Sequence, residues 1–289
     1  MAPLKGIACM IGGSALVTAN DALTKLLTGI YPVGQVIFLR GAFIMVPIAF
    51  LVWRAGGLAV LRTRNPKPHL LRVCCVMAGT ILFLNAIRYL PLAEAVAIAF
   101  SGPLFTTALA PKLLGEHVGW RRWMAVLAGF VGVLIIFQPG GTVMQWASLL
   151  ALSCGLTGAL RDILTRRMSD SESSEAILAY TSLGVLLGGL LSAPFGWHVV
   201  TPRDWGLFAL NGLVIGGAHF LLIEAFRYAE VALVAPFKYS TVVWATLYGY
   251  LLFGDVPENS TLIGAAVVVT SGLYILHRER RSRHAGEID

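Results

Sequence analysis

The chain contains 289 residues, of which 57% are hydrophobic and only 13% are charged, and its mean hydropathy is +0.76. A soluble domain carries about a quarter charged residues, so this composition places most of the chain in lipid. The formal net charge is +7, but the basic residues fall in short connectors rather than on one water-exposed face. Nucleic acid is therefore excluded as a partner.

The sequence carries no motif for enzymatic chemistry. It lacks a phosphate-binding loop, an H-E-x-x-H zinc motif and a G-x-S-x-G nucleophile elbow. Its four cysteines lie in apolar runs without C-x-x-C spacing, which argues against a zinc site or a disulfide framework. We therefore expect no enzymatic activity, no cofactor and no bound metal.

Ten apolar segments follow one another along the chain, each of about 20 residues and long enough to cross about 30 Å of hydrocarbon as a helix. We therefore predict an all-α membrane protein with ten transmembrane helices. The predicted segments are 4–29, 32–53, 70–89, 92–114, 120–138, 143–167, 175–195, 204–228, 231–253 and 259–277.

Two stretches of the sequence, 86–116 and 225–255, align without a gap at an offset of 225 − 86 = 139. The alignment pairs Ser101 with Ser240, and a glycine–acid pair closes both stretches. A period near half the chain indicates a duplicated unit, so we predict two five-helix repeats, residues 1–140 and 141–289. Because five is odd, the second repeat enters the membrane from the opposite side, as in the inverted repeats of secondary transporters.

Basic residues are distributed unevenly over the predicted connectors. If the first residues are cytoplasmic, 16 of the 22 Lys and Arg side chains fall on the cytoplasmic side and three on the opposite, outer side. Cytoplasmic connectors carry the excess of positive charge, so we predict that both termini are cytoplasmic.

Asp21 and Arg40 are ionisable residues within predicted helices, where an unpaired charge costs at least a few kcal/mol. Each lies about eight residues from the outer end of its segment, hence about 12 Å below the outer surface at 1.5 Å per residue. Antiparallel neighbours at equal depth can pair. The pair is either a structural salt bridge or a gating and proton-coupling element, and the sequence leaves both readings open.

Lys238 lies within the ninth segment and has no basic counterpart, because 238 − 139 gives Ala99. A charged residue that departs from the repeat is a candidate for contact with substrate or protons. Asp162 repeats Asp21 at an offset of 162 − 21 = 141. Its neighbour Arg161 either contributes to the same chemistry or extends its charge toward the membrane surface.

Other polar residues have two readings each. Asn20 and Asn85 either form interhelical hydrogen bonds or contact substrate. Glu94 begins the fourth segment near the membrane surface and is expected to be solvated, unless it takes part in gating. Glu116 and Asp255 each follow a glycine at a helix end, where solvation is also expected.

Aromatic and small residues also form patterns. Tyr239, Trp244 and Tyr248 share a broad face of the ninth segment and either line a pocket or pack against neighbours. Glycines spaced as in Gly129-x-x-Gly132 permit close approach of two helix backbones.

The duplicated A-[FI]-R-Y…G-[DE] block, together with Asp21-Ala22-Leu23-x-Lys25 and Phe38-Leu39-Arg40, resembles the EamA family of the drug/metabolite transporter superfamily. The resemblance covers nearly the whole chain. It implies a bacterial inner-membrane protein whose fourth and ninth helices border a central cavity, which puts Lys238, Tyr239 and Trp244 beside that cavity.

Members of this group resemble transporters for S-adenosylmethionine, riboflavin or opine-type metallophores such as pseudopaline. We therefore expect a secondary transporter of small polar organic metabolites that works by alternating access, with export favoured over uptake. A passive channel and a membrane-embedded enzyme are the weaker alternatives. The expected partners are a small-molecule substrate and the lipid bilayer. Proton coupling and a monomeric or homodimeric state remain open.

The expected site residues fall into two groups. Those expected to contact substrate are Lys238, Tyr239, Trp244, Asn85 and Asn20. Those expected to act in coupling or gating are Asp21, Arg40, Glu94, Arg161 and Asp162.

Overall fold

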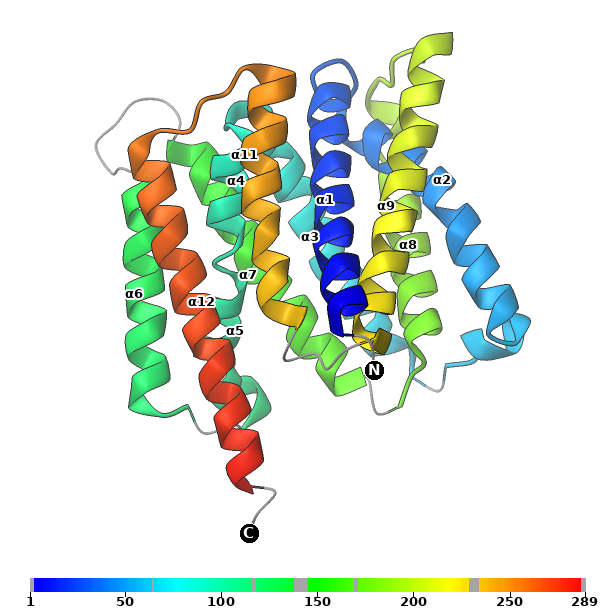
Figure 1. Ribbon diagram of the computed structural model, residues 1–289. Helices are drawn as coiled ribbons and strands as arrows, with labels where there is room; N and C mark the ends of the chain where they lie inside the picture. Colours follow the sequence, from blue (N-terminus) through cyan, green and yellow to red (C-terminus); the bar gives the residue numbers. More distant parts are fainter. Residues whose placement is uncertain are drawn as a thin grey trace.

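The computed structural model describes residues 3–63, 65–115, 118–137, 145–168, 171–228 and 234–286. All regular elements in these residues are helical (Figure 1). The domain boundary expected at residues 140 and 141 lies outside them, as does Glu116. The elements are α1 (Pro3–Thr28), α2 (Val33–Arg54), η1 (Gly57–Leu61), α3 (Pro66–Tyr89), α4 (Leu92–Ala99), α5 (Gly102–Leu114), α6 (Trp120–Phe137), α7 (Gln145–Met168), α8 (Ser174–Leu190), η2 (Ala193–Phe195), α9 (Pro202–Tyr228), η3 (Ala235–Tyr239), α11 (Ser240–Phe253) and α12 (Asn259–Gly286).

Eight segments of the described chain are long and apolar enough to cross a membrane. They correspond to α1, α2, α3, the α4–α5 pair, α7, α8 with η2, α9 and α12. The helices at the fifth and ninth predicted segments, α6 and α11, are not among the eight, and α11 has only 14 residues. α1 begins and α12 ends at the same end of the bundle (Figure 1).

The outward faces of the helices are apolar. On α6 the exposed side chains Met124, Leu127, Val131 and Leu134 recur every three or four residues and therefore form one stripe. A stripe of this kind, exposed rather than packed, suits a helix whose outer side contacts lipid.

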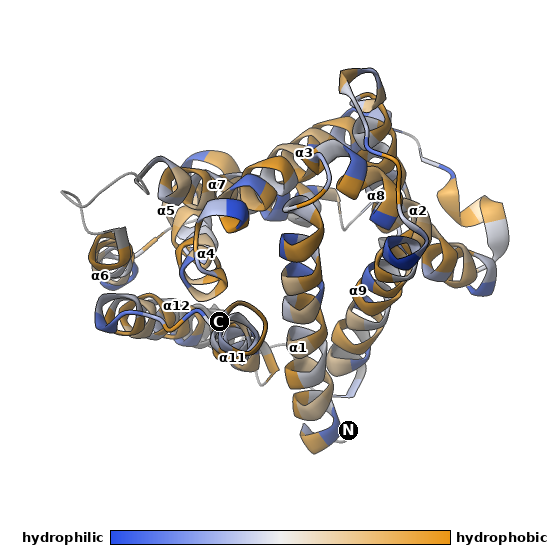
Figure 2. Cartoon of the chain, turned by 90° about the horizontal axis from the view of Figure 1, so that it is seen from above, coloured by the Kyte–Doolittle hydropathy of each residue, from blue (hydrophilic) through white to orange (hydrophobic). Residues whose placement is uncertain are grey.

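Helices from the two halves of the chain pack against each other. α1 packs against α9 and α3 against α7, while α2 contacts α8 and α6 contacts α12. Viewed along the bundle, α1, α3, α4 and α11 lie around its centre, and α6 and α2 lie toward opposite ends (Figure 2). The largest core cluster includes Leu92 and Ile98 of α4, Ala245 of α11 and Val268 of α12.

The contact between α6 and α12 depends on glycine. A Cβ atom added to Gly132 would lie 2.9 Å from the carbonyl oxygen of Gly264, which is too close for any side chain. The expectation of close backbone approach is confirmed for Gly132, whereas Gly129 faces the side chain of Leu104.

The predicted segments 92–114 and 231–253 are not continuous α-helices, and on this point the sequence-based prediction was wrong. The first is interrupted at Phe100 and Ser101, and the second contains the 3-10 segment η3 before α11 begins. Proline explains the first interruption, because Pro103 lacks the N–H that would bond the carbonyl of Ala99, and its ring crowds that carbonyl. The second interruption also contains a proline, Pro236 of η3.

Candidate functional site at the helix breaks

The two interrupted helices meet at their interruptions. Phe100, between α4 and α5, contacts Tyr239, the last residue of η3, with ring centroids 5.1 Å apart and planes 36° from parallel. The two residues are related by the repeat, since 239 − 100 = 139. Equivalent positions of the two half-sequences therefore touch each other at the point where each helix is broken.

Polar hydrogens near these breaks have no hydrogen-bond partner among the described residues. The hydroxyl of Ser101 is buried and unpartnered, and so is the repeat-related hydroxyl of Ser240. One turn along α11, the indole Nε1 of Trp244 is also buried without a partner. Unsatisfied buried donors are rare in proteins and call for an explanation such as an unseen water or ligand.

The aromatic candidates lie along the same element. Trp244 stacks on Tyr248 with ring centroids 6.2 Å apart and an interplanar angle of 23°. The ring of Tyr239 lies between Phe100 and α12, where its hydroxyl occupies the space that a Cβ on Gly272 would need. Tyr239 and Trp244 are both half-buried. The structure shows that these rings pack against neighbours, which is one of the two sequence readings.

Lys238 lies in η3, directly before Tyr239. Its side chain is exposed. Its ammonium has no hydrogen bond or ion pair among the described residues. Arg161 and Asp162 of α7 act on it electrostatically.

Arg161 and Asp162 form an ion pair with each other, with Arg161 Nη2 2.8 Å from Asp162 Oδ1. Their side chains are 39% and 55% exposed, so the pair is solvated rather than buried. Arg72 of α3 acts electrostatically on the same pair. Its guanidinium is held by Thr165 of α7 at 2.8 Å and by Thr181 of α8.

Asn20 is nine-tenths buried in a network between α1 and α9. Its amide donates to the side-chain oxygen of Asn211, and Asn211 donates to Thr24 Oγ1 at 2.9 Å. Arg40 Nη1 donates to Asn20 Oδ1 at 3.4 Å. Asn20 therefore connects α1, α2 and α9, as the interhelical reading of this residue expects.

Asp21 and Arg40 interact electrostatically, yet no ion pair within 4.0 Å joins them. Both side chains are partly exposed. The two residues therefore do not form the direct salt bridge that one sequence reading expected.

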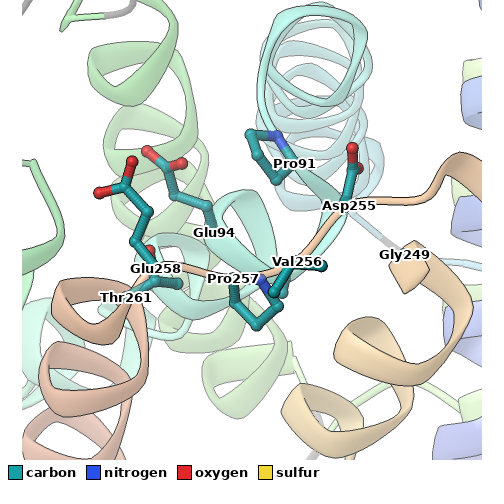
Figure 3. A pocket seen from close by; sticks show the side chains of 9 residues that line it. Pro91, Glu94, Gly249, Asp255, Val256, Pro257, Glu258 and Thr261 are labelled. Atoms are coloured by element: carbon teal, nitrogen blue, oxygen red, sulfur yellow. The ribbon is translucent and has the colours of Figure 1, made fainter.

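Glu94 and Asn85 lie apart from the helix breaks. The side chain of Asn85 donates to the carbonyl of Ile81 in its own helix at 2.7 Å. Glu94 lines a pocket of about 160 Å³ with Asp255 and Glu258, where its carboxylate accepts a hydrogen bond from Ser148. Figure 3 shows the carboxylates of Glu94 and Glu258 near each other, with Asp255 farther along the loop that carries Glu258.

A contact that joins three segments lies next to this pocket. Lys25 Nζ, in the last turn of α1, donates to the carbonyl of Leu90 at 2.9 Å and lies 3.2 Å from Asp255 Oδ2. The ammonium also lies 4.6 Å from the centroid of the Phe253 ring. Asp255 was expected to be solvated, and this was wrong, because the α11–α12 loop brings its carboxylate onto Lys25. We call Lys25, Leu90 and Asp255 the latch.

Sequence reasoning did not select the latch or Arg72. One signal for the latch was present, because Lys25 and Asp255 each lie in a duplicated motif that ends a predicted helix. Arg72 carried no such signal, since the sequence only showed a basic residue near a membrane surface.

Apolar helices that pack across the two halves, with broken helices in contact and unsatisfied donors beside them, define a multi-pass membrane protein of the transporter class. The chain matches the EamA-like transporter family over residues 4–138 and 145–276. It belongs to that family, and the resemblance expected from its motifs is confirmed.

Three named relatives differ in cargo and direction. The chain is 34% identical to the riboflavin transporter of Rhizobium johnstonii, over 78% of this chain and 75% of the relative. It is 30% identical to the S-adenosylmethionine uptake transporter of Rickettsia bellii, over 92% and 91%. It is 25% identical to the pseudopaline exporter of Pseudomonas aeruginosa, over 92% and 94%.

A solved crystal structure of another protein has the same fold. It aligns with a TM-score of 0.65 and 19% identity, and the alignment covers 96% of this chain and 98% of that protein. At this identity the likeness concerns the fold alone.

Proposed function

We propose that the protein is a secondary transporter of small polar organic metabolites in the bacterial inner membrane, working by alternating access and favouring export. The observation that carries this proposal is the contact between Phe100 and Tyr239 at two repeat-related helix breaks. Broken helices at the interface of two repeats are the usual location of substrate sites in secondary transporters.

The proposal includes ten membrane-spanning segments in two inverted repeats, 1–140 and 141–289. The helix packing supports it, because exchanging the two repeats turns the α1–α9 contact into the α7–α3 contact. The helix ends support it as well. Gly115 after α5 and Gly254 after α11 are related by the offset of 139, and both adopt the left-handed conformation with φ of 69°.

In the proposed orientation both termini are cytoplasmic and the latch lies at the outer end. The latch is formed, while Lys238, Arg161 and Asp162 are exposed. We therefore assign the structure to an outward-closed state. Opening the outer end would require Lys25 to leave both Asp255 and the carbonyl of Leu90.

The proposed roles of the site residues follow from their surroundings. Lys238 meets an acidic group of the cargo, Tyr239 and Trp244 shape the pocket, and Asn20 and Asn85 add amides. Asp21 and Arg40 respond to proton or cargo binding, because their charges interact although no direct salt bridge joins them. Arg161, Asp162 and Glu94 take part in gating at the two ends.

Counterflow in proteoliposomes tests the transport function. Vesicles loaded with amino acids, opine metallophores, riboflavin or S-adenosylmethionine are diluted into trace labelled cargo, and a carrier accumulates the label transiently and saturably. A passive channel would instead conduct current without counterflow. If none of these cargoes moves, the proposed cargo class is wrong.

Uptake of riboflavin or S-adenosylmethionine is the second candidate function. It is favoured by the relatives named for these cargoes, at 34% and 30% identity. Inside-out and right-side-out vesicles are given the same imposed proton gradient. Net accumulation of cargo under that gradient occurs in only one vesicle orientation, which distinguishes export from uptake.

A further inference from the structure

The pocket beside the latch lies between two short segments of the chain. Residues 90–94 lead from the end of α3 into α4, and residues 255–258 lead from α11 into α12. Both segments contribute residues to the wall of this pocket of about 160 Å³. The helices that follow them, α4 and α12, pack against each other. A movement that opens the outer end by separating α4 from α12 therefore separates the two segments as well.

One cation holds the two segments together. Lys25 Nζ donates to the carbonyl of Leu90 in the first segment and lies 3.2 Å from Asp255 Oδ2 in the second. The same ammonium is thus bound on both sides at once. The latch therefore acts only while the two segments stay close.

Two like charges act in the opposite sense. Glu94 belongs to the first segment and Glu258 to the second, both line the pocket, and their carboxylates lie near each other (Figure 3). The Glu94 carboxylate accepts a hydrogen bond from the buried Ser148 of α7, whereas Glu258 is exposed. Two ionised carboxylates repel each other more strongly the closer they lie. This pair, which we call the acid pair, therefore favours separation of the segments.

The other groups around the pocket leave this repulsion in place. Among the described residues that line it, the charged ones are Glu94, Asp255 and Glu258. Lys25 is bound to Asp255. Arg88, at the end of α3, lies 6.0 Å from the ring of Tyr89 and is not among the lining residues. The α11 helix contributes Gly249 to the pocket, and the last turn of α6, residues 134–137, is apolar.

This inference rests on the proposed alternating access. We propose that the acid pair is a proton-dependent release for the latch. When Glu94 and Glu258 are both ionised, their repulsion works against Lys25 and the outer end opens more often. A proton taken from water onto either carboxylate removes the repulsion, and the latch then holds the outer end closed. By linkage, the closed state binds this proton more tightly than the open state does.

Opening is measured by maleimide labelling of Ala22→Cys in the full chain without native cysteines, reconstituted in liposomes. Ala22 is fully buried one turn before Lys25. A membrane-permeant maleimide and the same pH on both sides make the result independent of the orientation of the chain. Because a thiol itself reacts faster as the pH rises, each labelling rate is divided by the rate in Glu94→Gln at the same pH.

The release predicts a ratio that depends on pH. At about pH 8 both carboxylates are ionised, and the chain with the intact acid pair labels about threefold faster than Glu94→Gln. At about pH 4.5, near which a glutamate carboxyl in water takes up a proton, the ratio falls toward one. The matched control is Glu175→Gln in the first turn of α8, which removes a carboxylate elsewhere and keeps the ratio of the intact pair.

A double-mutant cycle tests the pair itself. Glu258→Gln lowers the labelling rate at about pH 8 as much as Glu94→Gln does, and the double variant lowers it no further, because repulsion needs both carboxylates. Glu258→Gln also serves as the reference if Glu94→Gln does not fold, since Glu258 lies exposed in a loop.

Four results would overturn the release: no labelling in any background, a ratio of one at both pH values, a ratio that rises as the pH falls, or effects of the two single variants that add in the double variant. The transport function is judged separately by counterflow. Cargo that moves while the ratio stays at one leaves a transporter without this release. The expected ratio without any counterflow leaves the release and removes the transporter.

Discussion

At Ser101, near the helix breaks, a structural role and a functional role predict different results for the same substitution. Its hydroxyl is buried, yet it has no hydrogen-bond partner among the described residues. A buried unpaired hydroxyl destabilises a fold by about 1–3 kcal/mol, so a purely structural residue at this position would be better as alanine. We propose that a polar group of the cargo satisfies this hydroxyl, and only while the cargo is bound.

Ser101→Ala is expected to leave the unfolding temperature unchanged or to raise it, because no described hydrogen bond is lost. The same variant is expected to raise the KM for counterflow about five- to tenfold, through loss of one neutral hydrogen bond to cargo. Thr106→Ala is the control, since the Thr106 hydroxyl already donates to the carbonyl of Gly102 at 3.1 Å within its own helix. A clear loss of stability in Ser101→Ala without any change in KM would contradict the cargo role.

The latch connects elements that have to separate if the outer end opens. Lys25 belongs to α1, Leu90 terminates α3, and Asp255 lies between α11 and α12. The Lys25 and Asp255 side chains are 14% and 29% exposed, so water screens this pair less than a surface pair. Breaking it leaves a largely buried charge unpaired and so favours the open arrangement.

Reversing the charge at Asp255 with Asp255→Lys is expected to shift the population toward the outward-open state by about tenfold, corresponding to about 1.4 kcal/mol for one charged hydrogen bond. The readout is maleimide labelling of Ala22→Cys from the outer side, because Ala22 is fully buried one turn before Lys25. The double variant Lys25→Asp with Asp255→Lys restores an ion pair but not the hydrogen bond to the carbonyl of Leu90, and so brings the labelling rate part of the way back to the original. Equal labelling rates in all three backgrounds would show that the latch does not gate access.

Most helix positions could be predicted from the sequence, whereas the site geometry could not. Apolar length decides where a chain crosses lipid, so residues 4–29 and 204–228 correspond closely to α1 and α9. The interruption at Phe100 was missed, because the sequence stays apolar through Gly102-Pro103. Hydropathy measures apolar character and is not affected by the backbone hydrogen bond that Pro103 cannot form. The latch and the hydrogen bonds of Arg72 to Thr165 and Thr181 depend on contacts between segments far apart in the chain, which no local pattern encodes.

The proposed inverted arrangement of the two repeats makes a prediction about the molecule as a whole. The connector before α6 and the connector after α11 follow repeat-related helices, and Figure 1 shows them at opposite ends of the bundle. If the halves are inverted in the membrane, these connectors face different compartments. Gly119 and Val256 are exposed residues on the two connectors and suit labelling, since no Cβ clash arises at Gly119.

In a variant without native cysteines, Gly119→Cys is expected to react with a membrane-impermeant maleimide only in inside-out vesicles, and Val256→Cys only in right-side-out vesicles. The physical reason is that five spans separate equivalent positions, so each repeat presents the same connector to a different side. Labelling of both positions after detergent solubilisation controls for intrinsic reactivity. Should both cysteines react in the same vesicle orientation, the repeats would be parallel. The seam between them could then not open alternately to the two sides, and alternating access at the helix breaks would fail with it.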